Sequence, residues 1–189
     1  MMAGIGLLVV DLLEDFLRDW DPPRRASLLR ATNELIGMAR GHGIPVIWIR
    51  QEFARDLSDA FLEVRRKGTP ITLRGTPGAR VAAELDRRSG DPEIVKKRYS
   101  AFFGTDLDGL LAQLRVRRVI VAGINTHACV RMGVIDAYQR DLEMIVARDC
   151  IGSYDAEHED VTLRYLDRKI ASVLDNAQLR RSLETGAAA

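Results

Sequence analysis

Runs of consecutive apolar residues constrain the fold of this chain most strongly. Three such runs, rich in β-branched residues, lie at residues 5–10, 44–49 and 118–124. A strand that is apolar at nearly every position is buried on both faces, which is the pattern of a parallel sheet. Segments with apolar residues at helical spacing alternate with these runs, at residues 24–42, 126–140 and 155–167. The alternation predicts an α/β fold with helices on both faces of a parallel sheet.

The remaining segments extend this pattern. Weaker strands are expected at residues 93–96, 142–147 and 170–174, and Thr105 or Asp106 could cap a helix. A short helix should follow the last strand, with a frayed end at residues 186–189. Residues 51–90 have no regular period, so we expect helical pieces near 54–66 and 78–88 joined by turns, in a lid or substrate loop. The length and the absence of repeats or linkers predict a single domain over residues 1–189.

The charge and the cysteine content limit the possible partners and compartment. The 28 basic and 27 acidic residues nearly cancel, which gives no electrostatic reason to expect nucleic acid or an anionic membrane as a partner. A small-molecule substrate or another protein is the expected partner. The two cysteines are too few for a disulfide scaffold. The first apolar run ends at Asp11 without a preceding basic segment, so it predicts neither a signal peptide nor a membrane span, and a cytoplasmic protein is expected.

Residues that directly follow the strands are the candidates for chemistry, because ligands bind beyond the carboxyl ends of parallel strands. These candidates are Asp11, Arg50, Lys96 and residues 123–129. In the last segment a buried strand ends at residue 124 and a helix begins near residue 126, which places Cys129 in the first helical turn. Unpaired N–H groups and the helix dipole there favour a thiolate. Cys129 could equally pack as a small hydrophobic residue, and Cys150 is interpreted as structural.

A cysteine nucleophile needs an acid–base partner. The three histidines, His42, His127 and His158, are not well placed for a Cys–His–Asp arrangement. Asp11 could act as the proton shuttle, and Lys96 could stabilise the thiolate. Alternatively, Asp11 caps a helix and Lys96 belongs to a solvated basic run.

Three segments, at residues 11–16, 96–102 and 123–130, together resemble the motifs of the isochorismatase-like cysteine hydrolases. The second reads Lys-Lys-Arg-Tyr-Ser-Ala-Phe and the third Gly-Ile-Asn-Thr-His-Ala-Cys-Val, and the likeness runs in order from about residue 5 to residue 174. The resemblance implies that Asp11 shuttles protons, that Lys96 is the second member of a catalytic triad and that Cys129 is the nucleophile. Lys96 is chosen over Lys97 because the family lysine stands four residues before the motif serine, here Ser100.

The same resemblance implies structural features. It predicts a three-layer α/β/α, Rossmann-like fold with a six-stranded parallel sheet, and a homo-oligomer. It also predicts a cis peptide bond between Ile124 and Asn125, with an oxyanion hole formed by the backbone N–H groups of Asn125 and Cys129. The metal-binding nicotinamidase branch uses an Asp-x-His motif and a further histidine. This chain has no histidine between residues 43 and 126, so neither a metal ion nor another cofactor is expected.

The expected activity is hydrolysis of a small amide, ureido or lactam substrate through a thioester. Candidate substrate-binding residues, each of which could equally be a core or surface residue, are Phe16, Trp48, Arg50, Gln51, Arg74 and His127. One alternative is an isochorismatase-type vinyl-ether hydrolase, which would not need the thiol. A second is a non-catalytic oligomeric binding module. Dinucleotide binding is disfavoured, because no Gly-x-Gly-x-x-Gly motif follows the first strand.

Overall fold

The computed structural model describes residues 4–185, so the expected frayed end at residues 186–189 lies outside the described residues. Its centre is a six-stranded parallel sheet with the strand order β3-β2-β1-β4-β5-β6. The strands are β1 (Ile5–Val10), β2 (Val46–Gln51), β3 (Glu93–Lys96), β4 (Arg118–Ile124), β5 (Glu143–Gly152) and β6 (Ser172–Leu174). The predicted three-layer fold with a six-stranded parallel sheet is confirmed.

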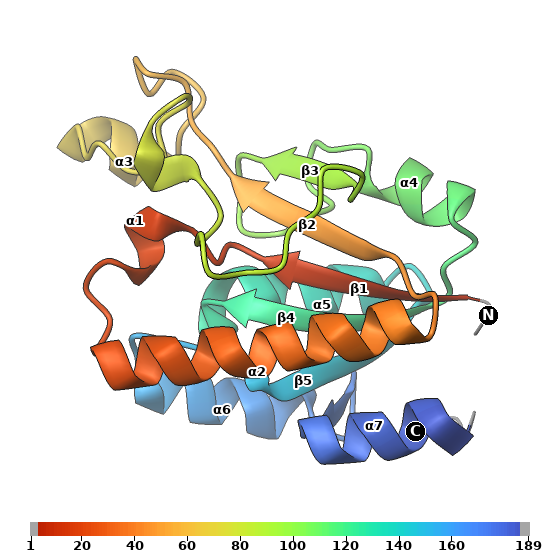
Figure 1. The fold of residues 1–189 in the computed structure, drawn as a ribbon. Helices are drawn as coiled ribbons and strands as arrows, with labels where there is room; N and C mark the ends of the chain where they lie inside the picture. The colour runs from red at the N-terminus through yellow and green to blue at the C-terminus, as the bar shows by residue number, and fades with distance from the viewer. Residues whose placement is uncertain (1–3, 186–189) are drawn as a thin grey trace.

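Helices cover both faces of the sheet (Figure 1). One face packs against α2 (Pro22–Gly41) and α7 (Asn176–Thr185), and the other against α4 (Leu107–Gln113), α5 (Arg131–Tyr138) and α6 (Ala156–Leu166). The shorter helices are α1 (Glu14–Leu17), α3 (Leu62–Lys67), the 3₁₀ helix η1 (Pro77–Ala79) and the π-helix η2 (Thr126–Val130). Among residues 4–185, no helix is both long and apolar enough to cross a membrane.

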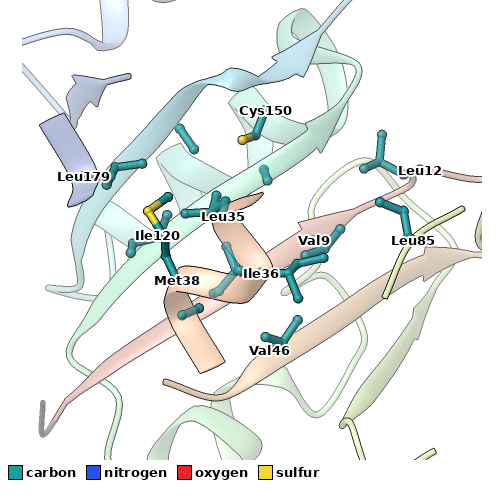
Figure 2. Close-up of a cluster of buried hydrophobic side chains, with 14 of the residues drawn as sticks. Val9, Leu12, Leu35, Ile36, Met38, Val46, Leu85, Ile120, Cys150 and Leu179 are labelled. Atoms are coloured by element: carbon teal, nitrogen blue, oxygen red, sulfur yellow. The ribbon is translucent and has the colours of Figure 1, made fainter. Parts of the chain in front are cut away.

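Strand β1 shows why its sequence is apolar throughout. All six of its residues are buried. Val9 packs into the core on the α2 side, whereas Leu8 packs into the core on the α5 side, because successive side chains point to opposite faces. Figure 2 shows the α2-side core, where Ile36 of α2 lies near Val9 and where Cys150 is also found. The core position of Cys150 agrees with its structural interpretation.

The strand order places a topological switch point at β1. The chain passes from β1 to β2 on one side and later returns to β4 on the other side. Crossovers that leave a central strand in opposite directions open a crevice at its carboxyl end, which is where ligands bind in such sheets. Asp11 stands at this position, and α1 and α3 lie beyond the same edge of the sheet (Figure 1).

The segment between β2 and β3 differs from the sequence prediction. Helices were expected near residues 54–66 and 78–88, but the structure has only α3 and η1 there. The rest is irregular chain held by distant partners. The Thr72 N–H donates to Asp15 Oδ2 at 2.7 Å, and Leu13 forms an antiparallel bridge with Val81. These contacts, rather than local helical spacing, decide the path of the segment.

Candidate active site

Asp11, Lys96 and Cys129 meet at the carboxyl edge of the sheet. Asp11 directly follows β1, Lys96 is the last residue of β3, and Cys129 lies on η2, which follows β4. The Lys96 ammonium nitrogen lies 2.6 Å from Asp11 Oδ2 and 3.4 Å from Cys129 Sγ. The structure therefore brings together three side chains that are far apart in the sequence.

The site is closed to solvent and internally hydrogen-bonded. Asp11 and Lys96 are 0% exposed and Cys129 is 6% exposed. Lys96 Nζ donates to Gln51 Oε1 at 3.2 Å and to the Arg98 carbonyl at 3.1 Å. The Gln51 N–H donates to Asp11 Oδ1 at 2.8 Å. A buried ion pair is tolerated only when such bonds satisfy its remaining polar atoms.

Lys96 is held as an ammonium ion. Burial, the largest single effect, would lower its pKa, but Asp11 and Cys129 together outweigh burial, so the pKa of Lys96 is raised. An ammonium group has three N–H donors. Gln51 Oε1, the Arg98 carbonyl and Cys129 Sγ accept these three hydrogen bonds, and Asp11 Oδ2 lies within ion-pair distance. Lys96 therefore supplies a fixed positive charge and has little tendency to give up its proton.

Cys129 is a neutral thiol at neutral pH. Burial raises its pKa to about 12, because the lowering by Lys96 is smaller than the burial effect and Asp11 acts in the raising direction. The expectation of a resting thiolate at a helix N-terminus is thus wrong. The surroundings also differ locally from the predicted helix over residues 126–140, since the π-helix η2 precedes the regular helix α5.

The connection from β4 to η2 depends on a glycine. Gly123 has φ of +122°, and a Cβ atom there would lie 1.9 Å from the Val10 carbonyl oxygen, so β1 and β4 approach each other too closely for any side chain. The peptide bond between Ile124 and Asn125 is cis, as predicted. The Asn125 N–H donates to no backbone acceptor within residues 4–185. The oxyanion-hole role of this N–H stays a prediction.

The two aromatic residues expected to line a substrate pocket, Phe16 and Trp48, both contact the α2-side core. Trp48 is buried in the α2-side core, and its Nε1 donates to Asp91 Oδ2 at 2.9 Å. Cys129 packs on the other face of the sheet, so Trp48 does not wall a pocket around the thiol. Phe16 of α1 is half-buried against the same α2-side core. Because β2 is buried on both faces, the sequence did not show toward which face the Trp48 side chain points.

The two arginines expected to bind substrate are engaged in ion pairs. Arg50 lies 2.7 Å from a Glu52 oxygen and 3.2 Å from a Glu93 oxygen. Burial would lower its pKa, but these carboxylates outweigh burial and raise the pKa of Arg50. Arg74 is exposed and lies 3.3 Å from Glu52. Neither guanidinium touches the buried triad.

The two remaining candidates have partners of their own. The Gln51 side chain does reach the triad, but there its oxygen accepts from Lys96. His127 is half-buried on η2, where its Nδ1 hydrogen-bonds with Ser153 Oγ and burial lowers its pKa.

Two surface aromatic residues that the sequence interpretation missed pack against residues of the segments that carry the triad or its surroundings. Tyr99 is half-exposed, and its ring centroid lies 4.7 Å from that of Phe61. Burial raises the pKa of Tyr99. Tyr154 is exposed and packs edge-to-face on His127 with a centroid distance of 5.0 Å. The position of Tyr99, three residues after Lys96, was the one available sequence signal.

Metal-ligating side chains are not grouped in the part of the chain that the structure describes. Within residues 4–185, no three His, Cys, Asp or Glu side chains are close enough together to hold a metal ion. Glu52, which follows β2, is instead paired with Arg50 and Arg74. The expectation that activity needs no metal stays a prediction.

Comparisons with known proteins agree with this geometry. The isochorismatase domain model matches residues 6–178. A probable inactive nicotinamidase of Arabidopsis thaliana is 33% identical over 145 residues, covering 72% of this chain and 74% of that protein. The maleamate amidohydrolase of Pseudomonas putida is 26% identical over 185 residues, covering 94% of this chain and 86% of that enzyme.

The fold also matches solved structures. A cysteine hydrolase from Pseudomonas syringae pv. phaseolicola 1448A superposes with a TM-score of 0.88 at 23% identity, covering 99% of this chain and 95% of that one. At this level of identity the similarity bears on the fold alone.

Proposed function

The chain belongs to the isochorismatase family, and on that premise we propose that it is a cysteine-dependent hydrolase of C–N bonds in small amide, ureido or lactam substrates. The observation that carries the proposal is the buried Asp11–Lys96 ion pair beside the Cys129 thiol. The maleamate amidohydrolase at 26% identity supports the amide class. The reaction is acyl transfer from nitrogen to sulfur and then to water.

In the first half-reaction the thiol is deprotonated only as it attacks. Cys129 Sγ adds to the substrate carbonyl carbon while its proton passes to the Asp11 carboxylate, which contacts the same Lys96 ammonium group as the sulfur in the buried cluster. The C–N bond then breaks, and Asp11 returns the proton to the leaving nitrogen. Lys96 stays protonated and stabilises first the developing thiolate and then the carboxylate. The products are an amine or ammonia and a thioester on Cys129.

In the second half-reaction water replaces the amine. Asp11 takes a proton from the water as its oxygen adds to the thioester carbonyl, and the C–S bond breaks with return of a proton to Cys129. The N–H groups of Asn125 and Cys129 are the proposed donors to the oxyanion in both steps, and each such donor typically lowers a barrier by about 3 kcal/mol. The Asn125 side chain has no part in this role, so Asn125→Ala should be milder than Cys129→Ala.

A second candidate is a binding module without catalysis. The relative at 33% identity is named a probable inactive nicotinamidase. Similarity to the family therefore does not by itself establish that this chain catalyses hydrolysis. The two candidates differ in what Cys129 does. Catalysis requires a transient acyl adduct on its sulfur, whereas a binding module forms none.

A substrate screen with mass spectrometry tests the proposal. Maleamate and a panel of small amides, ureido acids and lactams are incubated with the protein, and the Cys129 peptide is examined for an acyl adduct. Hydrolysis should fall near background in Cys129→Ala, Asp11→Asn and Lys96→Met, because members of one catalytic unit lose activity together. Amide hydrolysis that survives Cys129→Ala would contradict thiol catalysis, and cleavage of an added vinyl-ether substrate by that variant would favour the vinyl-ether hydrolase. No turnover and no adduct across the panel would favour the binding module.

The family membership leads us to propose further that residues 1–189 act as one domain within a homo-oligomer. Large apolar side chains at the surface, among them Tyr99, Phe103 and Tyr154, supply apolar area for such contacts. Sedimentation velocity should give a mass that is a multiple of 21.1 kDa.

A further inference from the structure

The helix that carries Cys129 is held by a residue from a different part of the chain. Thr126, three residues before Cys129 on η2, is fully buried, and its Oγ1 donates to Glu159 Oε1 at 2.9 Å. Glu159 lies on α6, and its side chain is only 19% exposed. The bond therefore joins η2, which ends at Val130, to α6, which begins at Ala156.

The Glu159 carboxylate is itself fixed. Its Oε2 lies 3.4 Å from Arg24 Nη2, and the same nitrogen donates to the Ser153 carbonyl at 2.7 Å. The Arg24 guanidinium also sits over the Trp20 ring, 4.6 Å from its centroid. Glu159 is therefore anchored between α6 and α2 and presents one oxygen to Thr126.

A second bond fastens the same turn of η2. His127 Nδ1 hydrogen-bonds with Ser153 Oγ, and Ser153 is buried directly after β5. Thr126 is thus tied to α6, and His127 to the residue that follows β5. Cys129, on the same short helix, contacts Lys96. The position of the sulfur depends on both sets of contacts.

We propose that Glu159 is a positioning residue that, through its hydrogen bond with Thr126, keeps η2 in place and Cys129 Sγ buried beside Lys96. The inference rests on the proposed function only for the consequence that misplacing the sulfur slows turnover. The competing explanation is that Glu159, in the first turn of α6, merely stabilises that helix through its dipole. Glu157 shares the first turn but is exposed, so it provides a matched control.

Release of η2 should change two measurable rates in opposite directions, because alkylation of Cys129 becomes faster and turnover becomes slower. Burial is the main cause of the high pKa of Cys129, so a sulfur that becomes hydrated has a lower pKa. Below the pKa, each unit of decrease gives about tenfold more thiolate and hence faster alkylation. Turnover falls at the same time, because the sulfur leaves its position beside Lys96 and Asp11.

The experiment measures alkylation of Cys129 by iodoacetamide in the folded protein, with peptide mass spectrometry as the readout and Cys150 as the reference thiol. Glu159→Ala should raise the Cys129 rate at pH 8 about tenfold and lower the pH midpoint by about one unit, with Cys150 unchanged. Glu159→Gln keeps an oxygen acceptor for Thr126 and should behave like the wild type, as should Glu157→Ala. Unchanged Cys129 kinetics in Glu159→Ala would overturn the proposal, as would an equal rise at Cys150.

A second pair of variants covers the case in which Glu159→Ala does not fold. Thr126→Val removes the hydroxyl at nearly constant volume, and Thr126→Ser retains it. Faster alkylation of Cys129 in the valine variant alone supports the proposal, whereas equal rates in both variants contradict it. Turnover of the amide panel by the wild type separates the two proposals. If no amide is hydrolysed but Glu159→Ala still releases Cys129, the proposed function fails and the positioning role stands.

Discussion

Two adjacent lysines provide a sharp test of the buried site. Lys96 is 0% exposed and pairs with Asp11, also 0% exposed, at 2.6 Å. Lys97 pairs with Asp59 at 3.0 Å, but those side chains are 29% and 32% exposed. The two residues share chemistry and neighbourhood and differ in burial. A comparison of Lys96→Met with Lys97→Met therefore isolates the effect of burying the charge.

The expected costs follow from this difference. Lys96→Met leaves the Asp11 carboxylate buried without its counter-ion, and breaking a buried pair in this way costs about 3–5 kcal/mol of unfolding free energy. Lys97→Met breaks a solvent-screened pair, for which the cost is about 0–1 kcal/mol. Hydrolysis should be lost in the first variant and retained in the second, because only Lys96 contacts the thiol.

Urea titration of both variants measures the unfolding free energies, and a double variant completes the test. Asp11→Asn combined with Lys96→Met removes both charges, so its cost should be clearly smaller than the sum of the two single costs. Additive costs would refute the reasoning that the pair is energetically coupled. A larger loss of stability or activity in Lys97→Met than in Lys96→Met would show that the wrong lysine has been assigned to the site.

Three further outcomes are expected. Gly123→Ala should lower the unfolding free energy by at least about 1–3 kcal/mol, because its Cβ would overlap a backbone oxygen of β1. Gly133→Ala on α5 is the control and should not destabilise the protein, because no atom lies within 4 Å of the added Cβ. Equal denaturation midpoints for the two variants would contradict the close approach of β1 and β4. Burial raises the pKa of both Cys129 and Cys150 from 9.0 to about 12, so their contribution to stability is complete below pH 9 and is lost as the pH rises toward 12. Urea titrations between pH 9 and 10.5 should show a decline approaching 1.4 kcal/mol per pH unit per thiol, and Cys150→Ala should reduce it; a flat profile would contradict the burial effect. Dialysis against EDTA should leave hydrolysis unchanged, since no three suitable donors are grouped within residues 4–185, and activity lost to EDTA and restored by zinc would overturn this expectation.

The sheet and the candidate triad could be predicted because their signals are local. A run of buried positions such as those of β1 is visible in the sequence, and Asp11 and Lys96 stand where such runs end. Motif order then related them to Cys129. Residues at strand ends are brought together by the parallel topology itself, so no further contact had to be known.

Properties set by distant contacts could not be predicted in the same way. The charge state of Cys129 depends on how deeply the folded chain buries it, and burial outweighed the helix N-terminus. Trp48 lies on the α2 side of β2, and the apolar pattern of this strand, which is buried on both faces, did not show which face Trp48 occupies. Glu159 and Thr126 are 33 positions apart, and nothing in the sequence around either residue indicates that their side chains are in contact.

The protonated, buried state of Cys129 also bears on how long the protein lasts. Peroxide and other electrophiles attack the thiolate rather than the thiol. Burial raises the pKa of Cys129, so its thiolate fraction near neutral pH is far below the few per cent of an ordinary cysteine. Oxidative inactivation of the idle protein should therefore be slow. In the proposed mechanism the sulfur is deprotonated only during attack on a carbonyl. Its reaction with oxidants would then occur mainly during turnover, so inactivation would follow the number of turnovers rather than the time elapsed.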